Sequence, residues 1–207
     1  MILVFIILAY LIGSIPTAVW LGKHFYNVDV REFGSGNAGA TNTFRVLGKK
    51  AGIPVLIIDI LKGSLAVALA YFSSLTTHSN DFINLQLGLG VAALLGHIFP
   101  VFAGFRGGKG VATILGIVIC ILPLASVLSL TVFLTVLFSS KIVSLSSMLA
   151  GIAFPIILIV GLSNTNPILT VFSITVAVLL IITHRKNIIR LLNKQESKVQ
   201  LFAVKAK

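Results

Sequence analysis

Long apolar stretches alternate with short polar ones along this chain, and the pattern predicts a bundle of membrane-spanning helices. A span needs about 20 predominantly apolar residues, with a range of roughly 17–25. Five stretches meet or approach that length: 2–22, 53–73, 83–103, 142–161 and 168–183. The first has no basic segment before it and no clear small-residue cleavage site, so we expect an uncleaved span and not a signal peptide.

A sixth apolar stretch, 111–138, is too long for one straight span and contains Pro123. It is either one long tilted helix or two shorter helices that turn near the proline. The distribution of Lys and Arg in the segments between the apolar stretches distinguishes these two alternatives.

Basic residues concentrate in four regions: 23–52, 104–110, Lys141 and the segment after 183. The other two connecting segments, 74–82 and 162–167, contain neither Lys nor Arg. Basic loops are cytoplasmic in most membrane proteins. The four basic regions share one side only if the sixth stretch crosses twice, as 111–123 and 124–138.

The sequence therefore predicts an all-α integral membrane protein with seven transmembrane helices in a single membrane-embedded domain, 1–207. Its N-terminus is expected outside and its C-terminus in the cytoplasm. All the unusual polar segments then fall on the cytoplasmic face.

The composition of the chain supports its assignment as an integral membrane protein. Hydrophobic residues make up 57% of the chain and charged residues 10%, whereas soluble domains average about 45–50% and 25%. The net charge of +11 does not indicate nucleic-acid binding, because the basic residues lie between apolar segments. They fit roles in topology, in holding anionic lipid or in binding an anionic substrate. The lone Cys120 indicates neither a disulfide nor a metal cluster, and no metal site is expected.

The first polar strip is "GSGNAGATNTFR", 34–45. Glycines let the backbone approach a ligand closely, and a helix from Ala38 onward would place Thr41 and Arg45 on one face. Phosphate is the natural ligand for such a strip; the alternative is a flexible polar loop with a helix cap. The candidate binding residues are Gly34, Ser35, Gly36, Asn37, Thr41, Asn42 and Arg45.

The second polar strip is "GHIFPVFAGFRGGKGVAT", 96–113. Lys109 stands among Gly107, Gly108 and Gly110 just before an apolar helix, an arrangement typical of phosphate cradles. It does not match a P-loop, which needs Ser or Thr where this chain has Gly110. The alternative is a tight turn whose lysine follows the positive-inside rule. His97 alone is more typical of a packed histidine than of a catalyst.

Two further strips carry weaker signals. In "SSKIVSLSS", 139–147, Lys141 and Ser144 either serve a ligand or belong to a short turn that caps a helix. In "THRKNIIR", 183–190, His184 and Asn187 are three residues apart and can face one site. The alternative there is a basic flank after the last span.

Asp59 and Lys62 lie one helical turn apart inside the second apolar stretch. Charges within a span usually face the protein interior. They either neutralise each other, which we favour, or Asp59 supports an arginine of the site.

The segments "GSGNAGATNTFRVLGKK", "GHIFPVFAGFRGGKGVAT" and "KIVSLSS", in this order and spacing, resemble the bacterial acyl-phosphate:glycerol-3-phosphate acyltransferases, the PlsY family. The resemblance extends over nearly the whole chain, including "HRKNIIRLL". It implies a multi-pass enzyme of the bacterial cytoplasmic (inner) membrane without a cofactor. The implied reaction moves an acyl group from acyl phosphate to the 1-hydroxyl of sn-glycerol 3-phosphate, giving lysophosphatidate and phosphate, the first acylation of phospholipid synthesis.

Each of these substrates carries a phosphate with up to about two negative charges, so several cations are expected in the site. Arg45, Lys109 and Lys141 are the best candidates, with Arg106 nearby. The resemblance implies the following roles: catalytic, Ser35, Arg45, Lys109 and His184; substrate-binding, Gly34, Gly36, Asn37, Thr41, Asn42, His97, Gly107, Gly108, Gly110, Lys141, Ser144 and Asn187.

Acyl phosphate is already an activated donor, so positioning and charge stabilisation can supply most of the catalysis. We expect Ser35 to bind substrate without forming an acyl-enzyme. A substrate phosphate would take the hydroxyl proton, with His184 as the rival base and His97 as a weaker one. The alternative functions are a membrane transporter of an organic phosphate or other anion, and a structural membrane subunit.

Overall fold

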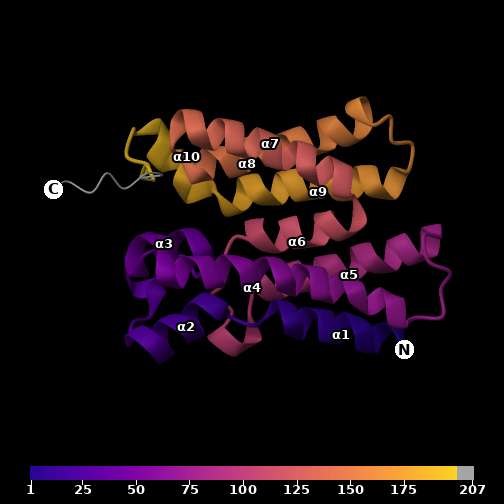
Figure 1. The fold of residues 1–207 in the computed structure, drawn as a ribbon, viewed down its shortest axis with the longest axis horizontal. Coiled ribbons are helices and arrows are strands. Elements are labelled where there is room, and N and C mark those ends of the chain that lie inside the picture. The colour runs from indigo at the N-terminus through magenta and orange to yellow at the C-terminus, as the bar shows by residue number, and fades with distance from the viewer. Residues whose placement is uncertain (200–207) are drawn as a thin grey trace. The chain divides into compact units, whose positions relative to one another are not determined.

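The computed structural model describes residues 1–199, in which every regular element is a helix. These residues divide into two compact units, with the boundary between Pro123 and Leu124, and each is described by itself (Figure 1). The all-α class expected from the sequence is confirmed.

The first unit contains six α-helices joined by loops and three 3₁₀ turns. The helices are α1 (Ile2–Gly13), α2 (Thr17–Tyr26), α3 (Ala40–Leu47), α4 (Lys49–Ala68), α5 (Asn80–Ile98) and α6 (Val111–Ile121). The 3₁₀ turns are η1 (Val30–Glu32), η2 (Leu69–Phe72) and η3 (Val101–Ala103).

The second unit contains α7 (Pro123–Ser140), apart from its first residue, α8 (Val143–Ile156), α9 (Pro167–Thr183) and α10 (Arg185–Leu192). A π-helical turn, η4 (Ile157–Gly161), extends α8. The span expected at 168–183 coincides with α9 to within one residue, because Asn166 accepts hydrogen bonds from two backbone N–H groups of its first turn and Pro167 begins the helix.

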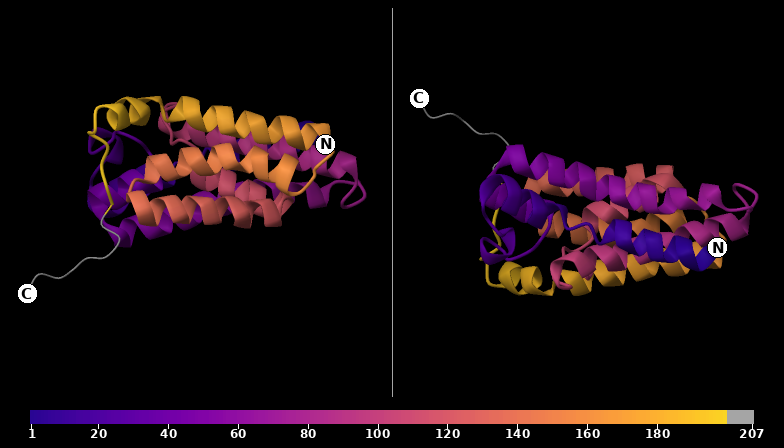
Figure 2. Two further views of the ribbon diagram at one scale, coloured as in Figure 1. Left: turned by 90° about the horizontal axis from the view of Figure 1, so that it is seen from above. Right: turned by 90° about the horizontal axis from the view of Figure 1, so that it is seen from below.

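The stretch 2–22, expected as one spanning helix, is divided between two helices. α1 ends at Gly13 and α2 begins at Thr17, with a bend of 41° between them, visible in the right-hand view of Figure 2. Pro16 causes the break, since it has no N–H to donate and its ring excludes a continuous helix. Hydropathy averaged over twenty residues does not detect such an interruption.

The interruption expected near Pro123 is confirmed. α6 ends at Ile121 and α7 begins at Pro123, with Leu122 between them in a non-helical conformation. A residue before proline is pushed out of the helical region, and proline itself suits the first position of a helix. α6 has only 11 residues, about 16 Å at 1.5 Å per residue.

Small residues bring the helices of the first unit into close contact. A Cβ atom on Gly13 of α1 would lie 2.0 Å from the Ala93 carbonyl oxygen of α5, and one on Gly116 of α6 would lie 2.0 Å from the Ile60 carbonyl oxygen of α4. Small residues at such crossings are typical of helix packing in membranes, where backbone proximity replaces the hydrophobic driving force. Figure 2 shows these helices side by side.

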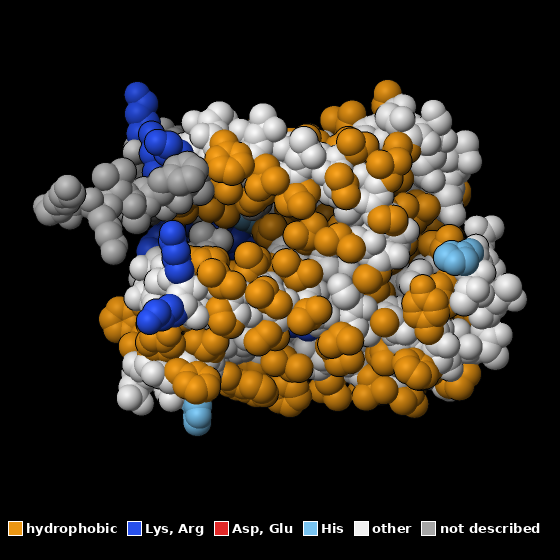
Figure 3. All heavy atoms as spheres, in the orientation of Figure 1, with side chains coloured by type: hydrophobic (Ala, Val, Ile, Leu, Met, Phe, Trp, Pro, Cys, Tyr) orange, Lys and Arg blue, Asp and Glu red, His pale blue; other side chains and the backbone are white. Residues whose placement is uncertain are grey.

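Within residues 1–199, four helical segments are long and apolar enough to cross a membrane: Lys49–Phe72, Asn80–Ala103, Pro123–Ser140 and Val143–Gly161. Two bent pairs, α1 with α2 and α9 with α10, raise the number to six if each pair is one span. On the visible face of the first unit, hydrophobic side chains cover the helices and basic ones gather at the end where α3 lies (Figure 3).

Candidate functional site

The first polar strip forms an ordered loop that leads into α3, and Asn42 holds it in place. The Asn42 side chain is 1% exposed. Its Nδ2 donates to the carbonyl oxygens of Val30, at 2.7 Å, and Phe33, at 3.1 Å. Its Oδ1 accepts from the backbone N–H of Ser35 and from the Ser35 hydroxyl. The amide therefore has two donor and two acceptor contacts within the chain, so the flexible-loop alternative is not supported.

The helical face expected to carry Thr41 and Arg45 is confirmed. α3 begins at Ala40, with Gly39 as its N-cap, and both side chains are exposed on it, while Asn42 and Thr43 are buried. The loop before α3 turns at Gly34 (φ +62°) and Gly36 (φ +73°), a conformation that glycine adopts without strain. Asn37 is half-buried. The N–H of Gly36 donates to the Phe33 carbonyl.

The second polar strip is built against His97, near the end of α5. The N–H of Gly108 donates to the His97 carbonyl oxygen at 3.1 Å, and that of Gly107 donates to the Ile98 carbonyl at 3.2 Å. A Cβ atom on Gly108 would lie 2.1 Å from Nε2 of His97. These two glycines therefore allow the loop to fold onto a buried histidine, and their N–H groups are already donated within the chain.

Lys109 and Gly110 lead directly into α6, as the sequence predicted. Gly110 is the N-cap residue, with φ of +87°, and Lys109 is half-buried. The first N–H groups of an α-helix have no intrahelical partner, and the helix dipole favours an anion there. A lysine next to such an end is suited to phosphate.

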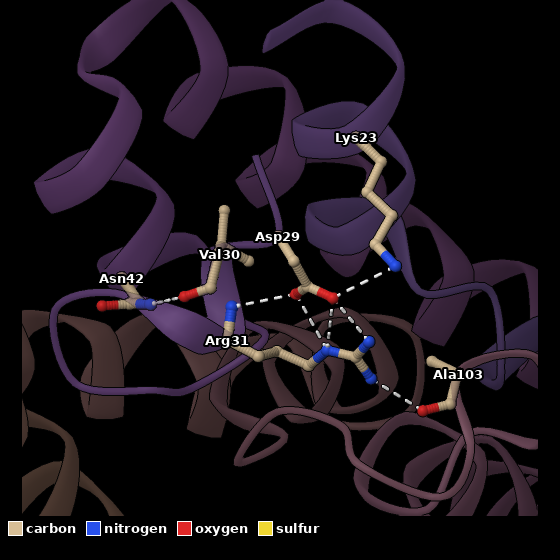
Figure 4. A network of polar contacts seen from close by, with 6 residues as sticks. All are labelled: Lys23, Asp29, Val30, Arg31, Asn42 and Ala103. Carbon is tan, nitrogen blue, oxygen red and sulfur yellow. Dashed lines mark hydrogen bonds and ion pairs between the residues drawn. The ribbon is translucent and has the colours of Figure 1, made fainter. Parts of the chain in front are cut away.

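Arg31 joins the two polar strips of the first unit. Its Nε and Nη2 form a bidentate pair with Asp29, with the shortest contact 2.7 Å, and its Nη1 donates to the Ala103 carbonyl oxygen at 2.8 Å (Figure 4). The hydrogen bonds from Arg31 hold the pKa of Asp29 well below its usual range, and Asp29 raises the pKa of Arg31. The loop before α3 and the loop before α6 therefore lie at the same end of the unit.

The intramembrane charges Asp59 and Lys62 pair with each other at 2.8 Å. Thr17 donates to Asp59 at 3.4 Å, and Lys62 also donates to the carbonyl oxygen of Ile15 at 3.1 Å. The structural role that we favoured is confirmed, since Asp59 pairs with a lysine and supports no arginine within the described residues. His97 Nδ1 is 3.8 Å from the same carboxylate.

In the second unit, Ser144 does not cap α8. Ile142 is the N-cap residue, its N–H donates to Ser140 Oγ, and the buried Ser144 hydroxyl donates to Glu196 Oε1 at 2.9 Å. Lys141 is exposed and has φ of +61°, which ends α7. The turn before α8 therefore does not use Ser144 as its cap.

Glu196 connects the third and fourth polar strips. Besides Ser144, Asn187 Nδ2 donates to Oε1 at 2.6 Å and Arg190 Nε donates to Oε2 at 2.8 Å. Burial alone would raise the pKa of Glu196, but the hydrogen bonds from Arg190, Asn187 and Ser144 outweigh it and lower the pKa. The carboxylate thus fixes two predicted substrate-binding side chains relative to each other.

His184 lies at the junction of α9 and α10 and is 2% exposed. Its Nδ1 is 2.7 Å from the Leu180 carbonyl oxygen. A carbonyl only accepts, so Nδ1 carries the hydrogen and the neutral ring has its basic lone pair on Nε2. The contact with the Leu180 carbonyl therefore fixes the tautomer of His184.

The predicted residues are thus divided between the two units; Asn42 contacts Ser35 in the first, and Glu196 contacts both Ser144 and Asn187 in the second. Sequence reasoning missed Asp29 and Arg31 in the first and Glu196 in the second. The available signal was that the chain has only five carboxylates, and three of them, Asp29, Glu32 and Glu196, lie in polar segments beside the strips.

Comparisons with known proteins found relatives that match nearly the whole chain. The family model "Glycerol-3-phosphate acyltransferase" matches residues 3–194. A glycerol-3-phosphate acyltransferase of Listeria monocytogenes is 49% identical over 194 residues, which is 94% of each chain. One of Enterococcus faecalis is 44% identical over 100% of this chain and 95% of its own.

A solved structure is also similar: the crystal structure of PlsY (YgiH), an integral membrane glycerol 3-phosphate acyltransferase, in its glycerol 3-phosphate form. The TM-score is 0.88 at 37% identity, over 100% of this chain and 99% of that one. The lysophosphatidic acid form of PlsY matches with a TM-score of 0.82. Taken with the family model and the relatives, these matches show that the chain belongs to the glycerol-3-phosphate acyltransferase family.

Proposed function

We propose that this protein transfers an acyl group from acyl phosphate to the 1-hydroxyl of glycerol 3-phosphate and releases lysophosphatidate and phosphate. The observation that carries the proposal is the match, at 37% identity over the full chain, to an enzyme solved with glycerol 3-phosphate and, separately, with lysophosphatidic acid. Family membership speaks against the transporter alternative.

In the first unit, Arg45 and Lys109 are the proposed phosphate ligands. Arg45 is exposed on α3, and Lys109 stands at the start of α6. Arginine suits bidentate phosphate binding, whereas lysine acts as a point charge. In the second unit, Lys141, Ser144, Asn187 and His184 are proposed to serve the same reaction.

The reaction needs little covalent help from the protein. The 1-hydroxyl oxygen attacks the acyl carbonyl carbon, an ester C–O bond forms, and the bond from that carbon to the phosphate oxygen breaks. Phosphate leaves with the electron pair, and the hydroxyl proton passes to a phosphate oxygen or to Nε2 of His184. Cations that stabilise both phosphates and hold the hydroxyl near the carbonyl would supply most of the acceleration.

For the membrane arrangement, we propose one domain with seven spans, in which α6 and α7 each count as a span. The N-terminus lies outside, the C-terminus lies in the cytoplasm, and the membrane is the bacterial cytoplasmic one. The positive-inside rule supports this orientation, and the interruption at Leu122 between α6 and α7 supports the count.

The experiment is a phosphate-release assay with purified protein and acyl phosphate. Release should require glycerol 3-phosphate and should match lysophosphatidate formed one to one, with no comparable rate from acyl-CoA. Uptake of glycerol 3-phosphate into proteoliposomes without acyl transfer would instead support the transporter.

A further inference from the structure

Arg31 is a basic residue beside the first polar strip, but its contacts are with the protein. It lies four residues before Ser35, just outside the strip. Its side chain is nevertheless only 14% exposed, and Nε, Nη1 and Nη2 all donate to chain atoms. A guanidinium held in this way is poorly placed to bind substrate.

The contacts of Arg31 lie on two separate loops. Asp29 is in the same loop, before α3, and its side chain is 9% exposed. Ala103, 72 residues away, is in the loop before α6 that carries Lys109. Figure 4 shows the guanidinium between the carboxylate and the carbonyl.

Both loops have their own attachments on either side of this contact. Asn42 ties the first loop to α3 through Val30, which is next to Arg31. The second loop is anchored by Tyr10, whose hydroxyl donates to the Phe99 carbonyl at 2.9 Å, and by the N–H of Gly108 on His97. The link from Arg31 to Ala103 therefore sets the spacing between two otherwise separately anchored loops.

We propose that Asp29 and Arg31 form a positioning pair that fixes the loop bearing Lys109 relative to the loop and helix bearing Arg45. Asp29 orients the guanidinium, and Arg31 carries the tether to the Ala103 carbonyl. This inference rests on the proposed function, since the pair is proposed to position the two phosphate ligands, Arg45 and Lys109.

The pair acts on the population of the binding-competent loop arrangement. When only a fraction of the molecules is competent, the apparent dissociation constant rises by the inverse of that fraction. Saturating substrate draws the loops back into place. Loss of the tether should therefore raise KM for glycerol 3-phosphate far more than it lowers kcat.

The test compares Arg31→Gln with Lys23→Gln. Lys23 contacts the same carboxylate at 3.2 Å, but its side chain is 57% exposed and it makes no part of the tether. A drop in competent population to about a tenth in Arg31→Gln would raise KM for glycerol 3-phosphate about tenfold, with kcat changing less than about threefold. Lys23→Gln should stay within about twofold of the parent on both constants, since an exposed ion pair contributes little.

A charge exchange, Asp29→Arg with Arg31→Asp, distinguishes the effect of losing the hydrogen bond to Ala103 from the effect of losing the ion pair. The exchange restores an ion pair, but an aspartate at position 31 has no N–H to donate to Ala103. KM for glycerol 3-phosphate should therefore stay above that of the parent protein, even if the thermal midpoint of the exchanged protein equals the parent's. A parent-like KM in the exchanged protein would overturn the tether.

A second readout is independent of activity. Spin labels on Glu32→Cys and Phe105→Cys, both exposed positions, report the distance between the two loops in a Cys120→Ser background. Arg31→Gln and the charge exchange should both broaden this distance distribution, whereas Lys23→Gln should not. A narrow, parent-like distribution in Arg31→Gln would refute the proposal. If the parent protein transfers no acyl group, the proposed function fails, but the distance measurement still tests the pair.

Discussion

Asn42 accepts two hydrogen bonds from Ser35 through one oxygen atom: Oδ1 lies 2.8 Å from the Ser35 backbone nitrogen and 3.0 Å from its hydroxyl oxygen. A nucleophilic serine needs a base that takes its proton. An amide oxygen orients a hydroxyl but does not deprotonate it. The contact therefore favours a serine that binds substrate over one that becomes acylated.

We accordingly expect no acyl-serine. Parent protein incubated with radiolabelled acyl phosphate, without glycerol 3-phosphate, should yield no labelled peptide containing Ser35 after denaturation and digestion. Ser35→Ala should lose about 0.5–3 kcal/mol of transition-state stabilisation and remain measurably active. A stoichiometric ester on that peptide, or parallel-line kinetics, would rule out direct transfer.

Arg45→Ala and Lys109→Ala should each lower kcat/KM at least about tenfold. Loss of a charged hydrogen bond to substrate costs roughly 1.5–3 kcal/mol, and 1.36 kcal/mol corresponds to tenfold. Lys49→Ala, at the exposed start of α4, is the matched control and should be nearly neutral. Near-normal kinetics in both site variants would refute these phosphate ligands.

Gly108→Ala should damage activity because the added methyl group would meet the His97 ring. The effect should appear mainly as a raised KM for glycerol 3-phosphate, since the displaced loop carries Lys109. Gly88 offers the control: it lies in α5, and a Cβ atom there would meet nothing within 4 Å. Gly88→Ala should be neutral or stabilising by up to about 1 kcal/mol. Equal kinetics in the two variants would contradict the packing argument.

Thermal stability should depend on pH through Glu196. Its folded pKa lies below the ordinary value of 4.5, so its stabilisation is fully present above about pH 4.5 and is lost as pH falls through the lower, folded value. Glu196→Gln keeps an acceptor for Asn187 and Ser144 but loses the ion pair with Arg190. In detergent, the difference in thermal midpoint between parent and variant should therefore shrink as pH is lowered from 6 to below 4. A constant difference would show that the carboxylate charge is not responsible.

Topology can be tested with single cysteines in a Cys120→Ser background. Thr77 and Thr165 are exposed positions in the loops without Lys or Arg, and Asn193 is exposed after α10. Cysteines at the first two should react with an impermeant thiol reagent on intact cells, and one at Asn193 only after permeabilisation. External labelling at Asn193 would overturn the seven-span orientation.

The sequence was most informative where one physical rule acts alone. Loop charge predicted that the strips around Arg45 and Lys109 share an end, and the contact from Arg31 to Ala103 bears this out within the first unit. Proline chemistry predicted the interruption at Pro123. The same chemistry at Pro16 was overlooked, because the stretch 2–22 satisfies the length and hydropathy of a span as a whole.

Which side chains point into the protein was harder to predict from the sequence. Asn42 holds the loop because α3 begins at Ala40 and directs that side chain toward Val30 and Phe33. The residue composition of an eight-residue helix does not show which of its side chains face inward. Glu196 was equally difficult to predict, because the hydrogen bond that it accepts from Ser144 joins residues 52 positions apart in the sequence.

The contact from Lys62 to the Ile15 carbonyl constrains how this chain can vary. In soluble proteins a buried ion pair is often exchanged for apolar residues of similar volume without loss of stability. Here, replacing both Asp59 and Lys62 with leucine would leave the Ile15 carbonyl, at the Pro16 break, with the hydrogen bond from the Thr17 N–H but without the one from the ammonium group. It would also remove the carboxylate that accepts from the Thr17 hydroxyl, in surroundings where water is scarce. Exchange of the pair for apolar residues should therefore cost more stability in this chain than in a soluble protein, because polar groups at the Pro16 break lose partners that water does not replace.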